Sequence, residues 1–412
     1  MLNFNDLLKT NDPSTMGKGD GSKPTLALFY QEEKCRDFLL DCIKTGGDAK
    51  VVVHKNTDDV IVEQLTKVEM DIVVLDLNYS RNIVSEARRI SYLLPNKASI
   101  VIVGREDSII TIRQLKEIGF YYVYWPIARN ELIDFFRHVQ SNRIHNLGVD
   151  KNRQAKRIAV LGAKGGVGTT FIASELTNIL IHQKNAKCLY VDHNFYSSDI
   201  DIALQLDKFE SKVATFDELE LKMDSALART MLSVELEKLS VLSFSAEELS
   251  SDKLRELQAN VVDALLSEYN FIVEDLSTAD ALAGNYQDYW RKIDYLILVA
   301  TPGVSELREA NKLKQKIHAL DETKTPLLLV INHVQPEKFS ALSHAEINQF
   351  LKYTPEAIIS FENKANSYLL ENKKVSQTKS KVAAELLQFT KLLLGEDKEK
   401  KKSLLSRLLG GR

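Results

Sequence analysis

The sequence is poor in the residues that disulfide frameworks, metal motifs and membrane spans require. Only three cysteines, Cys35, Cys42 and Cys188, occur among 412 residues, and their spacing fits neither disulfides nor a metal motif, which suits a reducing cytosol. No apolar run approaches membrane-spanning length, no signal peptide is evident at the N-terminus, and the histidines lack ligand spacing, so none is assigned to a metal. The net charge of −3 gives no overall field that attracts nucleic acid, and no nucleic-acid partner is expected.

One glycine-rich segment is distinctive in this otherwise ordinary soluble composition: Ala163-Lys164-Gly165-Gly166-Val167-Gly168-Thr169-Thr170. It follows an apolar run over 158–161 that is typical of a buried strand, and it precedes a helical pattern over 171–181. Glycines allow successive backbone N–H groups to point at one anion, and the helix N-terminus adds partial positive charge. Thr170 opens the helix and can place its hydroxyl on a magnesium ion. The segment therefore predicts a phosphate-binding loop.

The lysine that precedes the paired glycines resembles the deviant loop of the ParA/MinD group of ATPases. That resemblance implies ATP and Mg²⁺ as cofactors, and a Lys164 that reaches across a dimer interface to the partner's nucleotide in a catalytic as well as a binding role. The residues expected to bind the nucleotide are Lys164, Gly165, Gly166, Val167, Gly168, Thr169 and Thr170. Thr169 departs from the family, because such loops normally carry a lysine there. We therefore expect nucleotide binding with hydrolysis that is slow or absent.

An acid at the end of the next expected strand, 187–192, extends the resemblance. Asp192 matches the switch-one aspartate, which in the family lies near the magnesium and the attacking water, so a catalytic role is expected. The second acid of the family falls on Asn194, and an amide can orient water but cannot accept its proton. Asp199 and Asp201 follow. They are interpreted as part of a solvated loop face, with substitution for the missing acid as the alternative.

Two later residues also resemble nucleotide-site positions of the family. The buried run 269–276 resembles a Walker B strand, in which Asp275 would hold a magnesium-bound water. Capping of the next helix is the alternative, and Glu274, on the opposite face, is expected to be structural. Asn332 follows a strand expected over 326–331, at the position where the family's asparagine contacts adenine. Its amide offers a donor and an acceptor, and a turn-forming role is equally compatible with the sequence.

The first half of the chain alternates strands and helices, which predicts an open, doubly wound sheet. The expected strands are 25–30, 50–54, 71–77, 99–103 and 121–124, and the expected helices are 33–45, 60–67, 84–93, 109–118 and 129–140.

This order and length resemble a response-regulator receiver domain, with Asp76 at the position of the phosphoacceptor. The rest of that site is missing, because its acidic pair falls on Tyr30 and Gln31, its hydroxyl residue on Gly104 and its lysine on Trp125. Asp76 is therefore interpreted as a structural carboxylate. Phosphorylation without the usual metal clamp is the alternative, and it is chemically poor because nothing would neutralise the phosphoryl oxygens.

Together the patterns predict an α/β protein with two doubly wound sheets, a flavodoxin-like pseudo-receiver followed by a P-loop NTPase domain of ParA/MinD type. The expected limits are a flexible lead over 1–24, the pseudo-receiver over 25–140, a polar linker over 141–156, the ATPase domain over 157–395 and a basic tail over 396–412. Leucines of the tail fall on one face of a short helix. Contact with an anionic membrane, docking to a partner and a disordered tail are the three readings left open.

A pseudo-receiver followed by a deviant-loop ATPase resembles the TadZ/CpaE-like proteins, which belong to assembly systems for Flp-type (tad) pili. The resemblance implies a cytoplasmic homodimer that marks the pole or assembly site and recruits the pilus machinery, with peripheral membrane contact as an option for the tail. Two alternatives remain. One is a cycling ParA/MinD-type ATPase for DNA partition or division-site positioning, and the other is a nucleotide-free scaffold whose loop has decayed.

Overall fold

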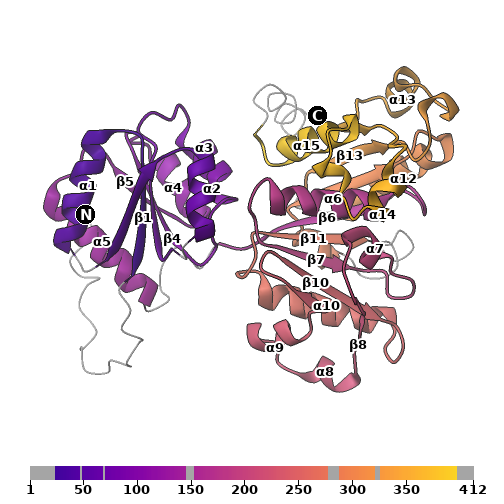
Figure 1. Ribbon diagram of the computed structural model, residues 1–412, viewed down its shortest axis with the longest axis horizontal. Coiled ribbons are helices and arrows are strands. Elements are labelled where there is room, and N and C mark those ends of the chain that lie inside the picture. The colour runs from indigo at the N-terminus through magenta and orange to yellow at the C-terminus, as the bar shows by residue number, and fades with distance from the viewer. Residues whose placement is uncertain are drawn as a thin grey trace.

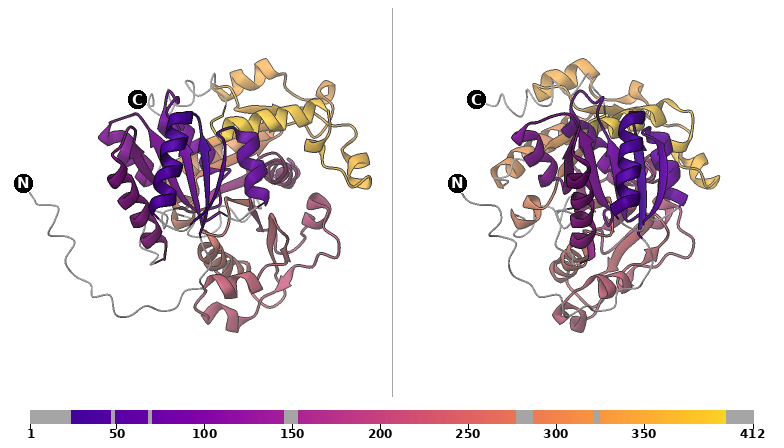
Figure 2. Two further views of the ribbon diagram at one scale, coloured as in Figure 1. Left: turned by 60° about the vertical axis from the view of Figure 1, so that its left-hand side comes forward. Right: turned by 90° about the vertical axis from the view of Figure 1, so that its left-hand side faces the viewer.

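The structure, a computed structural model, describes residues 24–46, 49–67, 70–144, 153–276, 287–320 and 325–396. Within these ranges the chain forms two sheets, which lie one beside the other along the long axis of the molecule (Figure 1). Seen end-on in the right panel of Figure 2, the first sheet lies in front of the second. The helices in the described ranges include none that is long and apolar enough to cross a membrane. The predicted lead and tail lie outside the described residues, apart from Pro24 and Glu396.

The first sheet has five parallel strands in the order β2-β1-β3-β4-β5. Its elements are β1 (Thr25–Tyr30), α1 (Glu33–Gly46), β2 (Lys50–Lys55), α2 (Asp58–Lys67), β3 (Ile72–Asp76), α3 (Ile83–Ser91), β4 (Ser99–Gly104), α4 (Ile109–Glu117), β5 (Phe120–Tyr124) and α5 (Arg129–Ile144). This is the strand order of flavodoxin-like doubly wound folds. All five expected strands and all five expected helices are present. The largest difference is at α5, which continues past its expected end at residue 140.

Burial on both faces explains the nearly unbroken apolar strands of this sheet. Strands β3 and β4 are buried along their whole length. Helices α1 and α5 cover one face, and α2, α3 and α4 cover the other, each over its own apolar cluster (Figure 1). Side-chain caps fix where two of these helices begin, since Asn82 accepts a hydrogen bond from Ser85 N and Ser108 accepts one from Thr111 N.

The second sheet has the order β14-β13-β12-β6-β11-β7-β10-β8, and β9 pairs with β10 as its antiparallel neighbour. Its elements are β6 (Lys156–Gly162), α6 (Thr169–His182), β7 (Cys188–Asp192), α7 (Ile200–Leu204), β8 (Lys212–Val213), α8 (Phe216–Glu220), α9 (Ser225–Thr230), β9 (Val234–Glu235), β10 (Leu239–Ser245), α10 (Ser251–Leu265), β11 (Phe271–Leu276), α11 (Gln287–Arg291), β12 (Tyr295–Ala300), α12 (Val304–Leu320), β13 (Leu327–Asn332), η3 (Glu337–Phe339), α13 (His344–Leu351), β14 (Ala357–Ile359), α14 (Ala365–Leu370), η4 (Val375–Gln377) and α15 (Lys381–Leu393).

Helices cover both faces of this sheet as well. Helices α6, α7 and α15 pack on one face around a common apolar cluster. Helices α9 and α10 cover part of the other face, and α11, α12 and α13 cover the rest. Strand β6 lies between β11 and β12, so the chain moves outward to both sides of β6. In open parallel sheets, ligands bind beyond the carboxyl ends of the strands at such a switch point.

The two sheets contact each other at the turn over residues 94–98. Arg153, from the predicted linker, is buried, and its guanidinium donates to three carbonyl oxygens of this turn at 2.7–3.2 Å. Asn270 Nδ2 donates to the carbonyl oxygen of Leu94 at 2.8 Å, and the ring of Tyr92 packs on that of Phe271 with centroids 5.4 Å apart. The first sheet therefore packs beside the amino ends of β6 and β11, and leaves their carboxyl ends uncovered.

Candidate functional site

The predicted phosphate loop connects β6 to α6 at the carboxyl edge of the second sheet. Ala163 N donates to Val299 O on β12 at 2.7 Å, and Val167 is buried beneath the loop. Gly166 and Gly168 have φ angles of 79° and 88°, which place both in the left-handed region that side-chain-bearing residues avoid. These turns leave residues 164–166 exposed at the N-terminus of α6, where an anion is favoured by the helix dipole and by free N–H groups.

Close packing fixes the shape of this loop. Asn332 is buried, and its Nδ2 donates to Val167 O at 2.9 Å. A Cβ added at Gly168 would lie 2.3 Å from the same nitrogen, and one at Gly162 would lie 2.4 Å from Thr169 Oγ1. Asn332 thus supports the loop from β13 through its amide nitrogen. Its expected contact with adenine stays a prediction.

Lys164, the lysine that resembles the family's signature residue, points away from its own loop. Its Nζ lies 3.1 Å from Ser305 Oγ and 3.2 Å from Glu306 Oε1, both in the first turn of α12. The lysine side chain is 53% exposed and that of Glu306 is 23% exposed. This is a solvated ion pair that a small gain elsewhere can replace.

Thr170 and Asp275, the two residues predicted to hold magnesium, lie near each other at this edge of the sheet. The hydroxyl of Thr170, in the first turn of α6, faces the carboxylate of Asp275 at the end of β11 and favours its ionised form. Tyr190 donates its hydroxyl to Asp275 Oδ2 at 3.0 Å. Burial raises the pKa of Asp275 to about 6, and the neighbouring carboxylate of Asp192 adds to the shift.

Asp192 ends β7 and pairs in register with Asp275 on the adjacent strand, so the two carboxylates leave the sheet side by side. Ser243 Oγ donates to Asp192 Oδ2 at 3.1 Å, and Asn194 N donates to Oδ1 at 2.9 Å. Burial raises the pKa of Asp192 too. The side chain of Asn194 is held by Ser197, whose carbonyl oxygen and N–H contact Nδ2 and Oδ1. Both polar atoms of the amide are therefore engaged within the loop.

The donor set suits magnesium bound to a nucleotide phosphate. Mg²⁺ takes oxygen ligands, keeps several waters and is commonly held by one or two carboxylates together with substrate phosphates. Thr170, Asp192 and Asp275 bring one hydroxyl and two carboxylates to the edge where the loop presents its N–H groups. Two adjacent buried carboxylates with raised pKa values repel each other, and a divalent cation would relieve that repulsion. The residues present therefore fit the group that the loop predicts.

Glu274, one residue before Asp275, belongs to a separate buried network on the other face of β11. Arg157 Nε donates to Glu274 Oε1 at 2.8 Å, His193 Nε2 lies 3.1 Å from Oε2, and the hydroxyl of Tyr289 donates to Oε2 at 2.9 Å. Burial alone would raise the pKa of Glu274, but the guanidinium of Arg157 and the imidazole of His193 lower it to about 2. This network supports the strand behind the site, in agreement with the structural role expected for Glu274.

Asp76 in the first sheet is fully buried and satisfied by the backbone. Its carboxylate accepts three N–H groups at 2.8–3.0 Å, two of them from Gln31 and Glu32. A Cβ added at Gly104, where a receiver carries its hydroxyl residue, would lie 2.5 Å from Ile83 Cδ1. An apolar side chain thus fills the space that the hydroxyl residue would need at position 104. These contacts agree with the structural interpretation of Asp76.

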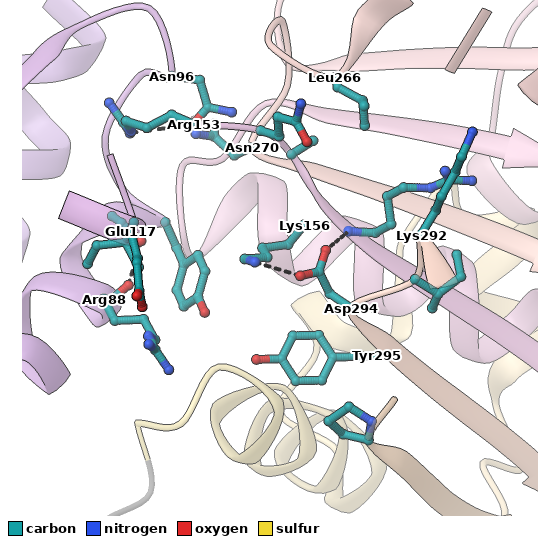
Figure 3. A pocket seen from close by; sticks show the side chains of 18 of the residues that line it. Arg88, Asn96, Glu117, Arg153, Lys156, Leu266, Asn270, Lys292, Asp294 and Tyr295 are labelled. Carbon is teal, nitrogen blue, oxygen red and sulfur yellow. Dashed lines mark hydrogen bonds and ion pairs between the residues drawn. The ribbon is translucent and has the colours of Figure 1, made fainter. Parts of the chain in front are cut away.

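A large cavity lies between the two sheets, away from the phosphate loop (Figure 3). It measures about 810 Å³ and is lined by the amino ends of β6, β12 and β13. Lys156 pairs with Asp294 at 2.5 Å and Lys292 pairs with Asp263 at 2.6 Å, while Arg153 donates to the 94–98 turn. The cavity therefore lies at the contact between the two sheets, at the amino ends of the strands, on the opposite edge from the phosphate loop.

The structure brings the predicted site residues to one edge of the second sheet: Lys164, Gly165, Gly166, Val167, Gly168, Thr169, Thr170, Asp192, Asp275 and Asn332. The sequence analysis missed residues around the two acids: Tyr190 and Ser243 donate hydrogen bonds to them, and the hydroxyl of Ser198 lowers the pKa of Asp192. A signal existed for Tyr190, because residues two apart on a strand share a face and Tyr190 precedes Asp192 by two. Ser198 and Ser243 reach the site from a loop and from β10, which no local pattern indicates.

Comparison with solved structures finds ATPases of the ParA, MinD and McdA kinds. A ParA family ATPase from Chlorobium tepidum TLS is 18% identical, with a TM-score of 0.48, covering 57% of this chain and 98% of its own. The septum site-determining protein MinD from Pyrococcus horikoshii OT3, complexed with Mg-ADP, is 16% identical, with a TM-score of 0.44, covering 58% and 96%. A complex of a substituted Cyanothece McdA with ATP is 14% identical, with a TM-score of 0.45, covering 59% and 97%. No family model and no curated protein matches the chain.

Proposed function

We propose that this chain binds ATP with Mg²⁺ at the loop over residues 163–170, and that bound nucleotide favours a homodimer. The observation that supports it best is the convergence of three features at one strand edge. A glycine-shaped loop opens a helix, Thr170 presents a hydroxyl, and two buried carboxylates end adjacent strands. A nucleoside triphosphate with its magnesium would bind to the loop, the hydroxyl and the carboxylates together.

The chain's own residues divide the work of binding. Backbone N–H groups of residues 164–170 would hold the phosphate oxygens, with the partial charge of the α6 N-terminus behind them. Thr170 and Asp275 would hold the magnesium, directly or through its water, and the ion supplies positive charge between the phosphates. Asp192 would orient the remaining magnesium-bound water. Asn332 keeps the loop in place from β13.

Hydrolysis is expected to be slow for two independent reasons. Thr169 brings a short hydroxyl where a lysine would neutralise the β- and γ-phosphates, so part of the transition-state charge has no partner within the loop. Asn194 cannot accept a proton, and its amide is held by Ser197. Lys164 can supply the missing charge to a partner subunit only after it leaves Glu306. Bound nucleotide would therefore act mainly to stabilise the dimer.

The direct test is calorimetric titration of ATP in the presence of Mg²⁺, with molecular mass measured on the same samples. The wild-type chain should bind one ATP per subunit and double its mass. Thr170→Val should weaken magnesium-dependent binding, and Lys164→Ala should bind ATP but remain monomeric. Asp201→Asn, a carboxylate change outside the proposed site, is the matched control. A wild-type chain that binds no adenine nucleotide at any magnesium concentration would leave the nucleotide-free scaffold as the better reading.

We further propose a role as a localisation and assembly factor for Flp-type (tad) pili. Two observations support the proposal. A five-stranded doubly wound sheet precedes the sheet that carries the phosphate loop, and Asp76, at the position of a receiver's phosphoacceptor, is buried and hydrogen-bonded by backbone N–H groups. A cytoplasmic protein that recruits pilus components would be expected to lose pili when its dimer fails. Complementation of a gene deletion with wild-type chain or Lys164→Ala, followed by counting of surface pili, tests this role. Intact pili in the deletion strain, together with rapid ATP turnover in vitro, would favour a cycling partition or positioning ATPase.

A further inference from the structure

Two histidines and a glutamate that the sequence analysis left unassigned lie together just after β13. His333 follows the last residue of β13, Glu337 begins η3, and His344 begins α13. One ring nitrogen of each histidine and one carboxylate oxygen of Glu337 all lie within 4.8 Å of one another. The sequence separates these residues by four and by seven positions, and the turn through η3 brings them together.

His333 is held in place while retaining an unused nitrogen. The residue is 4% exposed, and its backbone N–H donates to Ile359 O on β14 at 2.9 Å. Its Nδ1 lies 3.2 Å from Ser340 Oγ, and its buried Nε2 has no hydrogen-bond partner among the described residues. A buried polar atom without a partner carries a free-energy cost. Histidine ligands of metals commonly have this arrangement, with one nitrogen oriented by a neighbouring oxygen and the other on the metal.

The other two side chains can close around an ion bound to His333. Glu337 and His344 are exposed, so neither has to leave a packed position in order to move. The imidazoles are already in contact, with ring centroids 5.7 Å apart. Tetrahedral ligands at about 2.0–2.1 Å from zinc lie about 3.3 Å from one another, so the three atoms need to approach by roughly 1.5 Å at most. Rotamer changes of two exposed side chains cover that distance.

We propose that His333, Glu337 and His344 form a binding site for a divalent transition-metal ion, of which Zn²⁺ is the best fit. Two imidazoles and one carboxylate suit zinc better than magnesium, which prefers oxygen ligands alone. Three protein ligands leave a fourth position for water or for a group from another molecule. The site is separate from Thr170, Asp192 and Asp275, and does not require the nucleotide.

An ion here would fasten the segment that borders the phosphate loop. Asn332, directly before His333, donates to the loop at Val167, and Val334 Cγ1 would lie 3.9 Å from a Cβ at Gly168. Coordination would tie the end of β13 to η3 and to the start of α13. The expected consequence in the ligand-free protein is greater thermal stability in the presence of zinc, because an ion that binds the folded chain alone stabilises it by mass action.

The test uses the full chain without a histidine tag and without nucleotide, because ATP itself binds metals. Zn²⁺ is titrated against a chromophoric chelator, and Co²⁺ is used as a spectroscopic substitute. The wild-type chain should bind one equivalent of Zn²⁺, and Co²⁺ should give the visible absorption of a four-coordinate site. His344→Ala and Glu337→Gln should each weaken binding by at least about tenfold, since loss of an outer hydrogen-bond partner alone typically costs 10–100-fold.

Two control variants separate this site from others. His182→Ala removes a different exposed histidine, and Asp275→Asn alters the acidic pair at the phosphate loop; both should retain the full equivalent of Zn²⁺ and its thermal stabilisation. The proposal is overturned if the wild-type chain takes up no zinc. It is equally overturned if His344→Ala and Glu337→Gln bind zinc as tightly as wild type, or if binding is lost in Asp275→Asn alone.

Discussion

Release of Lys164 from Glu306 should strengthen the nucleotide-dependent dimer. In the single chain, Lys164 Nζ lies 3.2 Å from Glu306 Oε1, so the ammonium group must leave this carboxylate before it can contact a phosphate on another subunit. Glu306→Gln keeps the size and most hydrogen-bonding capacity of the side chain but removes its charge. The substitution therefore weakens the competing contact and leaves the phosphate loop unchanged.

The size of the effect follows from the exposure of the pair. Lys164 is 53% exposed and Glu306 is 23% exposed, so the pair is close to the solvent-exposed class, whose members contribute about 0.2–1 kcal/mol each. A symmetric dimer breaks two such pairs. The free energy of dimer dissociation in ATP and Mg²⁺ should therefore rise by about 0.4–2 kcal/mol. This corresponds to a dimer dissociation constant that is roughly 2- to 30-fold lower. The difference should shrink at high salt, since exposed pairs are screened.

Sedimentation velocity over a concentration series, with ATP and Mg²⁺, measures this constant. Glu309→Gln is the matched control, because Glu309 lies one turn later on α12 and makes a similar exposed pair with Lys312 at 3.2 Å. Glu306→Gln should tighten the dimer, while Glu309→Gln should not. Lys164→Ala combined with Glu306→Gln should lose the gain. Equal dimer constants for Glu306→Gln and wild type would show that this ion pair does not oppose assembly, and the reasoning would fail.

Three further outcomes are expected. Gly168→Ala should destabilise the chain by about 1–3 kcal/mol and abolish ATP binding, because its φ of 88° and the neighbouring amide leave no room for a Cβ. Gly165→Ala should leave stability unchanged, because no protein atom lies within 4 Å of a Cβ at that position. Chemical denaturation checks the stability of both variants, and calorimetry checks ATP binding by Gly168→Ala. Asp275→Asn should raise the unfolding free energy at pH 7 by about 3 kcal/mol. The gain should disappear below about pH 4, because a folded-state pKa near 6 gives the wild type stability at low pH that is lost as the pH rises through 6, and chemical denaturation across this pH range measures it. Thr169→Lys should tighten ATP binding in calorimetry with little gain in steady-state turnover. Only Thr169→Lys combined with Asn194→Asp should raise kcat by about tenfold or more. The same gain from Thr169→Lys alone would show that Asn194 does not limit hydrolysis.

The parallel strands were predictable because their burial imposes one composition. Five strands of the first sheet, and β6, β7, β11, β12 and β13 of the second, are apolar runs bounded by turn residues, and a strand covered on both faces requires such runs. The phosphate loop was predictable for a related reason. Left-handed φ angles at Gly166 and Gly168 restrict those positions to glycine, so the chemistry of the backbone is visible in the sequence.

Elements and contacts that depend on distant partners were not predictable. Strands β8 and β9 have two residues each, and the serines at 240, 243 and 245 interrupt the apolar run of β10 without a regular alternation, so no local pattern distinguishes these strands from loops. Arg153 is polar, lies in a stretch with linker composition, and is buried because carbonyl oxygens from another sheet surround it. Asn332 was matched to a base contact by its place after a strand, whereas its contact with Val167 depends on how closely β13 approaches the loop.

Under the proposed function, the arrangement of charges allows a loop without its usual lysine to act as a nucleotide switch. In the single chain, Asp192 and Asp275 are buried next to each other with raised pKa values, so their ionised forms cost more than in water and would be stabilised by a cation. Magnesium would supply that cation and would bring the phosphates with it. Lys164 would then supply to the other subunit the charge that Thr169 does not supply within its own. Each subunit on its own lacks one positive charge at its phosphates, so tight binding and dimer formation become linked, and ATP affinity should rise with protein concentration. An ATP affinity that does not change with protein concentration would show that ATP binding and dimer formation are not linked.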